Sequence, residues 1–341
     1  MSPNRNKHTG SRLARAAAML VLLAAGADAL GGDNYLGLVS DNDLYVDGRD
    51  RHYTAGTQLA WAMARGAAPR WLSWPGALSP LDGGAAAREV SLAIGQVIAT
   101  PEDLAAANPD PTDRPYAGWL YGDLAVINHA GMNEDEIGLS VGTLGPASLA
   151  AKAHRLLHDL TPSVKPRGWH AQVDDEPTLQ LRYRFSRFIP VKPDDVWKGD
   201  LVPRAQLSLG NVYTGLDLGL AWRFGSYVPR RDLPARIGPG LASATPRFEA
   251  RRGRTDWMFR ADVVGHLVAH NVFLDGSLFD DDSPGVDSRS FAWQASAGVQ
   301  FTCGTLPLPF AFGFTYVWRE SEFHGQRGMN RYGSVNLALR F

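Results

Sequence analysis

The sequence contains a single cysteine, Cys303, among its 341 residues. One cysteine excludes an intramolecular disulfide, so other interactions must hold the fold together. No stretch after Leu30 stays apolar over the roughly 18 positions that a membrane-spanning helix needs. The 34 Lys and Arg residues are matched by 35 Asp and Glu residues, so the net charge is −1. This balance lacks the basic footprint of a nucleic-acid-binding protein, and we expect no nucleic-acid partner.

The first 29 residues are typical of a secretory signal peptide. A positively charged start is followed by an apolar run at 16–25 and a small-residue cleavage site at 27–29. The basic residues are Arg5, Lys7, Arg12 and Arg15. A buried N-terminal helix is the alternative interpretation. We expect a signal peptide at 1–29 and one β domain at 30–341, either soluble in the periplasm or inserted in the outer membrane.

Most of the remaining chain alternates apolar and polar residues. Strict alternation over about ten residues is typical of a strand with two different faces. We predict about twelve strands, near 34–40, 53–64, 88–98, 117–128, 135–143, 178–187, 202–211, 216–224, 256–268, 289–302, 309–319 and 331–341.

The alternation alone fits two kinds of all-β protein. In a soluble sandwich the polar face, which includes Arg182, Arg184 and Arg223, would face solvent, and in a barrel it would line the lumen. The signal peptide, the even number of strands and the terminal Phe341 favour the barrel. We therefore predict a transmembrane antiparallel β-barrel of about twelve strands.

Strand parity assigns the connections to the two ends of such a barrel. With a periplasmic N-terminus, the extracellular connections are 41–52, 99–116, 144–177, 269–288 and 320–330. The connection at 225–255 then lies on the periplasmic side, where turns are normally short. The sequence offers no physical reason for its length.

One predicted helix, from about Pro146 to Leu160, interrupts the strands. Ala, Leu, Lys and Arg dominate it, and these residues favour helices. His154 and His158 are four residues apart, so both imidazoles lie on one side of the helix. The pair is compatible with a zinc site, although no third ligand is obvious, and with two ordinary surface histidines. We expect Trp119 and Trp169 to be interfacial or packing residues instead of substrate contacts. Arg182 and Arg184 are expected to line the solvated lumen instead of forming a phosphate site.

The first predicted strand ends in Asp41-Asn42-Asp43. Two carboxylates beside an amide supply oxygen ligands of the kind that calcium prefers. The same residue types are also common in turns, so the pattern alone leaves both interpretations open.

Several other short runs carry a family resemblance. They are Gly95-Gln96, Thr100-Pro101, Asp113-Arg114-Pro115-Tyr116-Ala117-Gly118-Trp119-Leu120-Tyr121, Gly168-Trp169-His170-Ala171-Gln172, Asp175-Glu176-Pro177, Phe273-Leu274-Asp275-Gly276 and Glu322-Phe323-His324-Gly325-Gln326. From about Tyr35 to Phe341 the chain resembles the LpxR family of outer-membrane lipid A 3′-O-deacylases. The resemblance implies a twelve-stranded barrel that removes the 3′-linked acyloxyacyl group of lipid A with calcium, at a site between the barrel wall and an extracellular helix.

The resemblance also implies site residues. Asn42 and Asp43 match the family's Asn-Asp pair, and His158 matches its catalytic histidine. His154 stands where the family usually has Gln, and His170 where it usually has Asp. We expect Asp43 and Asp41 to bind calcium and His158 to take a proton from water, with Thr54 as an alternative nucleophile.

The leading functional prediction is therefore a lipid A deacylase, a carboxylic ester hydrolase. We expect a monomer in the bacterial outer membrane, with its site facing the extracellular leaflet and lipopolysaccharide as its substrate. A non-catalytic barrel, serving as a pore or a surface-binding protein, is the first alternative. An outer-membrane phospholipase that uses the same site is the second.

Overall fold

The computed structural model describes residues 33–46, 52–160, 164–191, 198–229 and 245–341. The predicted signal peptide lies outside these residues, as do parts of the connections 41–52, 144–177 and 225–255. None of the described helices is long and apolar enough to cross a membrane.

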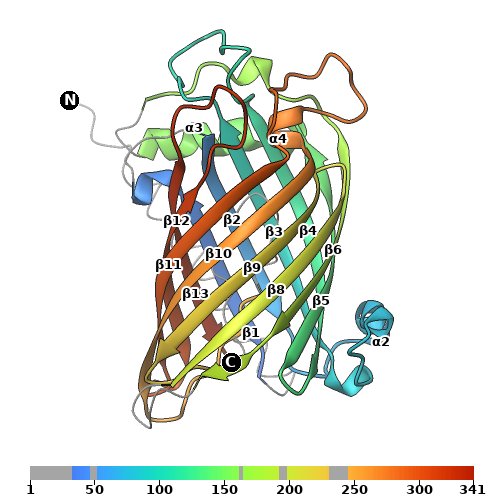
Figure 1. Cartoon of the computed structure of the whole chain (residues 1–341), viewed down its shortest axis with the longest axis vertical. Coiled ribbons are helices and arrows are strands. Elements are labelled where there is room, and N and C mark those ends of the chain that lie inside the picture. The colour runs from blue at the N-terminus through green and yellow to red at the C-terminus, as the bar shows by residue number, and fades with distance from the viewer. Residues whose placement is uncertain (1–32, 47–51, 161–163, 192–197, 230–244) are drawn as a thin grey trace, which may run out of the picture.

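The strands form one closed antiparallel barrel (Figure 1). The first strand, β1, pairs with the last, β13, and this pairing closes the wall. β6 and β7 pair with successive parts of the same strand, β8, so together they count as one of the twelve strands of the wall. The strands are β1 (Tyr35–Asn42), β2 (His52–Ala62), β3 (Glu89–Thr100), β4 (Ala117–Ala130), β5 (Asn133–Leu144), β6 (Pro177–Arg187), β7 (Ile189–Val191), β8 (Lys198–Gly210), β9 (Tyr213–Gly225), β10 (Thr255–Asn271), β11 (Phe291–Cys303), β12 (Phe310–Arg319) and β13 (Asn330–Arg340).

The predicted twelve-stranded barrel is confirmed, with one detail that the sequence pattern missed. The sixth strand of the wall, made of β6 and β7, is interrupted at Phe188. The backbone N–H of Phe188 bonds to Met132 O at 2.8 Å instead of to β8. Pro190 follows within β7 and has no N–H to contribute to the sheet. These two features explain why the sixth strand divides into β6 and β7.

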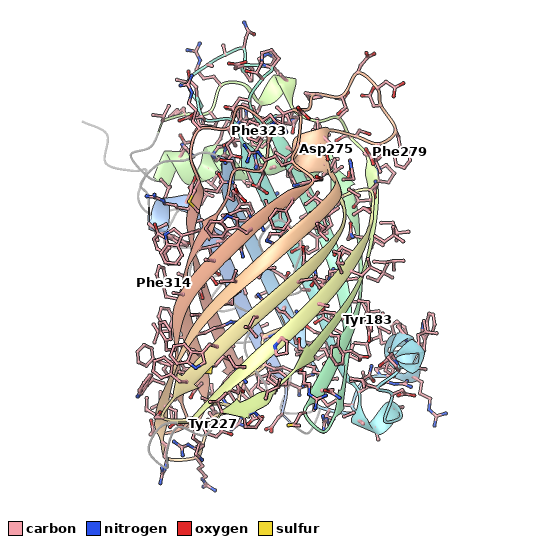
Figure 2. All side chains as sticks on the ribbon, viewed as in Figure 1. Tyr183, Tyr227, Asp275, Phe279, Phe314 and Phe323 are labelled. Carbon is pink, nitrogen blue, oxygen red and sulfur yellow. The ribbon has the colours of Figure 1, made fainter. Side chains whose placement is uncertain are left out.

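The two faces of the wall differ as the alternation predicts. Outward positions carry apolar side chains that are strongly exposed, as a lipid-facing surface requires. They include Leu38, Ile94, Val141, Leu179, Leu181, Leu207, Leu209, Leu218, Leu220, Trp222, Val263, Trp293, Phe301, Phe312 and Leu337. Figure 2 shows side chains covering the outside of the wall, where Phe314 and Tyr183 are labelled.

The inner face is polar and its charges are paired. Arg182 Nη2 lies 2.7 Å from Asp123 Oδ1, and Arg204 Nη2 lies 2.6 Å from Asp262 Oδ1. Arg223 pairs with Asp200. Buried charges are tolerated when they are paired in this way. Arg182, Arg184 and Arg223 therefore face the lumen, as predicted.

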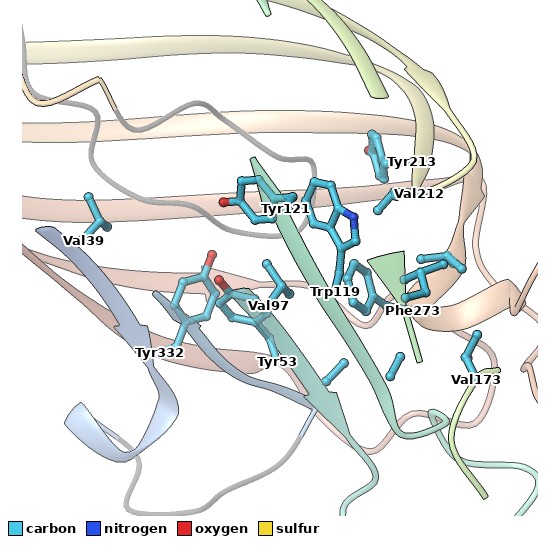
Figure 3. Close-up of a cluster of buried hydrophobic side chains, with 14 of the residues drawn as sticks. Val39, Tyr53, Val97, Trp119, Tyr121, Val173, Val212, Tyr213, Phe273 and Tyr332 are labelled. Carbon is cyan, nitrogen blue, oxygen red and sulfur yellow. The ribbon is translucent and has the colours of Figure 1, made fainter. Parts of the chain in front are cut away.

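One end of the interior is filled by apolar side chains (Figure 3). Trp119 stacks on Tyr121 with ring centroids 4.0 Å apart, and its indole nitrogen donates to Thr178 Oγ1 at 2.8 Å. The short helix α4 (Val272–Asp275) contributes Val272 and Phe273 to the same cluster. Of the two roles expected for Trp119, interfacial or packing, the structure shows packing.

The opposite end is filled by the described part of the connection 225–255. Phe248 packs edge-on against Tyr35 with ring centroids 5.5 Å apart, and Arg247 Nη1 lies 3.0 Å from Glu89 Oε2. Pro246 contacts the inner face of β1 at Gly37, where a Cβ would lie 2.0 Å from the Pro246 Cβ. The described residues 246–248 of this connection thus lie inside the barrel, which gives a physical reason for its length.

Candidate active site on the outer wall

The predicted helix at 146–160 is confirmed, with a break near its start. A 3₁₀ turn, η5 (Pro146–Ser148), is followed by Leu149, which adopts a left-handed conformation at φ 60°. The α-helix α3 (Ala150–Leu160) then runs along the outside of the barrel (Figure 1). A bulky residue with positive φ is strained, and such strain concentrates at functional sites.

The start of α3 packs directly against Gly118 of β4, and we call this contact the seat of the helix. A Cβ at Gly118 would lie 2.1 Å from Ala150 Cβ and 2.4 Å from Ser148 Oγ. Gln96 of β3 secures the same turn by donating to Ser148 O at 2.6 Å. Only glycine lets the helix approach the strand so closely.

The strand register extends this seat into a row across the outer face. Gly118 pairs with Ile98, Ile98 pairs with Ala55, and Ala55 pairs with Asn42 at the end of β1. Ala55, Ile98 and Ala150 belong to one buried cluster, against which Ala153 also packs. α3 therefore covers the outer wall from β4 towards β2.

One stripe of α3 faces the wall. Ala150, His154 and His158 follow one another at four-residue spacing, and all three are buried. The two imidazole rings meet edge to face with centroids 4.3 Å apart. The surface interpretation of these histidines is therefore wrong.

Trp169 fixes the orientation of His154. The indole Nε1 of Trp169 donates to His154 Nδ1 at 3.2 Å, and Trp169 itself packs on Tyr116 with ring centroids 4.8 Å apart. Because an indole nitrogen can only donate, Nδ1 accepts, and a neutral His154 carries its proton on Nε2. The hydrogen bond from Trp169 thus holds the neutral imidazole of His154, which contacts His158, in its Nε2–H tautomer.

Asn42 and Asp43 lie at the far end of the row. Asn42 caps the 3₁₀ turn η2 (Asp43–Tyr45), and its Oδ1 accepts from Leu44 N at 2.7 Å. Asp43 begins that turn and is buried. Asp41, one residue earlier, has its side chain on the inner face, where the Tyr53 hydroxyl donates to Asp41 Oδ2 at 3.0 Å. The structure thus separates the Asp41 carboxylate from the outward-facing Asn42.

Thr54 directly precedes Ala55 of the row and is buried. A bulge between Tyr53 and Ala55 displaces it from the regular register, and its Oγ1 lies 2.6 Å from Thr100 Oγ1. The hydroxyl is buried and engaged with another hydroxyl. His170, in contrast, is exposed in the short turn η6 (Trp169–Ala171).

The oxygen-rich end of the row suits a hard cation. Among the described residues, no group of three or more His, Cys, Asp or Glu side chains is placed to hold a metal ion. Zinc needs three or four such ligands, whereas calcium also accepts amide and backbone oxygens and waters. The Asn42 amide and the Asp43 carboxylate fit calcium better than the histidine pair fits zinc.

A family model described as outer membrane protein LpxR matches residues 13–341. The chain belongs to the LpxR family of outer-membrane proteins.

A comparison with solved structures finds several similar chains. LpxR from Salmonella typhimurium is similar at 19% identity and a TM-score of 0.68, over 90% of this chain and 99% of that chain. The beta domain of the Bordetella autotransporter Brka gives 9% identity and a TM-score of 0.43, over 91% of this chain and 99% of that chain. The likeness to LpxR from Salmonella typhimurium concerns the fold alone. A comparison with curated protein sequences finds no significant match.

The motifs that carry the LpxR resemblance meet in space. Arg114 Nη2 lies 2.7 Å from Glu322 Oε2, and Arg319 Nη1 lies 3.0 Å from Glu322 Oε1. Burial alone would raise the pKa of Glu322, but Arg114 and Arg319 outweigh it and lower that pKa to about 2. Tyr116, two residues after Arg114, supports Trp169. The LpxR motif therefore joins the loop between β12 and β13 to the packing around His154.

Three further features of this LpxR-family site could not be assigned from the sequence. Gly118 as the helix seat, Gln96 as its support and Trp169 as the donor to His154 each depend on a distant partner. Their only sequence signal is membership in the quoted motifs, which names the residues but not their contacts.

Proposed function

We propose that this protein is an outer-membrane lipid A 3′-O-deacylase that hydrolyses the 3′-linked acyloxyacyl ester at the site beneath α3. The observation that carries the proposal is the burial of two imidazoles against the lipid-facing wall of a barrel. Ionisable groups at such positions are costly and usually serve function. Family membership supports the same activity.

The length of α3 supports a position of His158 close to Asn42 and Asp43, at the end of β1. From Ala150 to His158 an α-helix rises about 12 Å. Three strand spacings, from β4 to β1, amount to about 14 Å. A helix seated on β4 at Ala150 therefore carries His158 close to the end of β1.

His158 is suited to act as the general base. A neutral imidazole can take a proton from water, which then attacks the ester carbonyl. The fixed Nε2–H tautomer of His154 gives the neighbouring ring a defined hydrogen-bonding environment. Asn42, whose amide oxygen already accepts from Leu44, presents its NH₂ group as a donor for the developing oxyanion.

Calcium is the proposed cofactor, and Asn42, Asp43 and nearby backbone oxygens would hold it. When bound, calcium would polarise the ester carbonyl and stabilise negative charge on its oxygen. Asp41 contributes less readily, because its side chain accepts from Tyr53 inside the barrel. Water is the preferred nucleophile, because the Thr54 hydroxyl is engaged with Thr100.

The pore alternative is less well supported. An apolar cluster fills one end of the lumen, the segment 245–254 occupies the other, and the charges between them are paired. The phospholipase alternative uses the same site and differs in substrate. The proposed orientation places α3 at the extracellular leaflet, where lipid A resides, and the protein is expected to act as a monomer.

The test is hydrolysis by the purified protein in detergent of lipid A and, separately, of a glycerophospholipid, with products identified by mass spectrometry. We expect loss of the 3′-linked acyloxyacyl group from lipid A and little phospholipid cleavage. Phospholipid cleavage without lipid A cleavage would favour the phospholipase, and cleavage of neither would remove the enzymatic proposal.

Removal of calcium provides the test of the cofactor. Treatment with a calcium-selective chelator should abolish lipid A hydrolysis, and added calcium should restore it. Full activity after complete chelation would contradict the calcium proposal, and recovery with zinc alone would favour the His154–His158 pair as the metal site.

A further inference from the structure

The connection between β2 and β3 projects sideways from the barrel, near the end opposite α3. It contains the one-turn helix α2 (Arg70–Ser73) and the 3₁₀ helices η3 (Trp74–Leu78) and η4 (Ala85–Ala87). Figure 1 shows α2 standing outside the wall beside β5. The proposed catalytic site lies at the other end of the barrel and does not use this connection.

Internal bonds hold this connection in one conformation. Arg88 donates from Nη1 to Ser73 O at 3.1 Å and from Nε to Asp82 Oδ1 at 3.0 Å. The backbone of the connection at Gly76 lies directly on the outer face of β4, since a Cβ at Gly76 would be 2.8 Å from Val126 Cγ1. The segment is therefore a fixed attachment to the wall.

A carboxylate on the outer wall explains part of this attachment. Asp135 of β5 pairs in register with Asn128 and shares the outward face with Val141. Its carboxylate accepts from Ser79 Oγ, from Asn128 Nδ2 at 3.1 Å and from the Tyr183 hydroxyl at 3.2 Å. A charge facing lipid is costly unless it is covered and bonded, and Ser79 of the connection helps to cover it. Tyr183, labelled in Figure 2, lies on the same side of the barrel as α2.

The opposite side of this connection exposes large apolar side chains. Trp71, Trp74 and Leu78 are 72%, 57% and 69% exposed. Trp71 and Trp74 are three residues apart, so their side chains are neighbours on the helical turn, and Leu78 ends the 3₁₀ helix that follows. Exposure of this size in a segment held by several bonds indicates a surface that another phase or molecule covers.

We propose that Pro69–Leu78 is an interfacial anchor that inserts Trp71, Trp74 and Leu78 into the lipid leaflet at the end opposite α3. The segment stands beside the wall, where the bilayer must lie, and continues the apolar outer face of β5 and β6, where Val141, Leu179 and Leu181 are exposed. Tryptophan is enriched at membrane interfaces, because its ring is apolar and its N–H is polar. Arg70 is also exposed and would meet lipid phosphates.

The test compares tryptophan fluorescence of the full-length mature protein and its W71F/W74F variant in phospholipid vesicles. The difference between the two spectra reports Trp71 and Trp74. We expect this difference emission to be blue-shifted relative to tryptophan in water. Phospholipids brominated near the headgroup end of the acyl chain should quench most of it, and aqueous acrylamide should quench little.

Two matched variants calibrate the measurement. W222F removes an outward tryptophan of the wall, whose signal brominated lipid should quench, and W119F removes one packed inside the lumen, whose signal neither quencher should reach. Quenching of the Trp71 and Trp74 signal by acrylamide but not by brominated lipid would place the segment in water and overturn the proposal. Resistance to both quenchers would indicate a protein contact and overturn it equally. No substrate is present, so the result is independent of the proposed hydrolysis.

Discussion

Trp169 connects the loop before β6 to the helix that carries both buried histidines. Its indole N–H bonds to His154 Nδ1, while its ring packs on Tyr116. His154 in turn contacts His158. Trp169 can therefore influence, through His154, how the proposed base is oriented.

Trp169→Phe tests this connection by removing the N–H and keeping most of the ring packing. A lost hydrogen bond of this kind costs about 0.5–1.5 kcal/mol, so turnover of lipid A should fall roughly 2- to 10-fold. Trp119→Phe is the control, because it removes an equally buried indole bond inside the lumen. Equal turnover in the two variants would contradict a positioning role for Trp169.

The lowered pKa of Glu322 predicts how the stability of the folded protein changes in acid. Its folded pKa of about 2 lies below the ordinary value of 4.5, so its stabilising contribution is complete above about pH 4.5 and is lost as the pH falls towards 2. The shift corresponds to a contribution on the order of 3 kcal/mol. Glu322→Gln should therefore lower the unfolding temperature at pH 7 and flatten its decline between pH 5 and 2.

The measurement is heat-dependent gel mobility of the detergent-solubilised barrel after incubation across this pH range. Glu320→Gln, in the same loop, is the control and should leave the pH profile close to wild type. An unchanged profile in Glu322→Gln would show that the Arg114 and Arg319 pairing does not stabilise the loop.

At the scale of elements, the position of α3 depends on one glycine. Its composition predicted the helix, because helix propensity is a local property, and the four-residue spacing put both histidines on one side. Its seat on the outer wall could not be predicted, since it depends on the register Gly118–Ile98–Ala55–Asn42 across four strands. The pairing of Arg114 with Glu322 was equally inaccessible, because 208 residues separate the two.

Gly118→Ala tests the seat of α3. The new methyl group would overlap Ala150 and Ser148, and a displacement of about 1 Å at a catalytic group can cost on the order of 100-fold in rate. Lipid A turnover should therefore fall at least roughly 10-fold, while gel mobility still reports a folded barrel. Gly122→Ala, on the same face of β4, is the control, because its Cβ would lie 3.9 Å from the nearest atom, Ala93 O. Similar activity in both variants would mean that the helix does not need this close approach.

At the scale of the whole molecule, alternation predicted strands with two different faces, and the signal peptide, the even strand number and Phe341 favoured a barrel over a sandwich. The plug formed by 245–254 and the lateral segment at 69–78 were not predicted. Neither has a periodic pattern, and each is recognisable only from the surface that it contacts. The predicted signal peptide stays a prediction, since 1–29 lies outside the described residues.

The central claim is that hydrolysis takes place beneath α3, on the outside of the barrel, with His158 as the base. The most direct test is the turnover of lipid A by purified His158→Ala, with His324→Ala as an exposed histidine control at the same end of the barrel. Loss of a general base costs roughly 100- to 10,000-fold. We expect a loss of that size in His158→Ala, wild-type turnover in His324→Ala and unchanged heat-dependent gel mobility in both. Near wild-type turnover by folded His158→Ala would contradict the account.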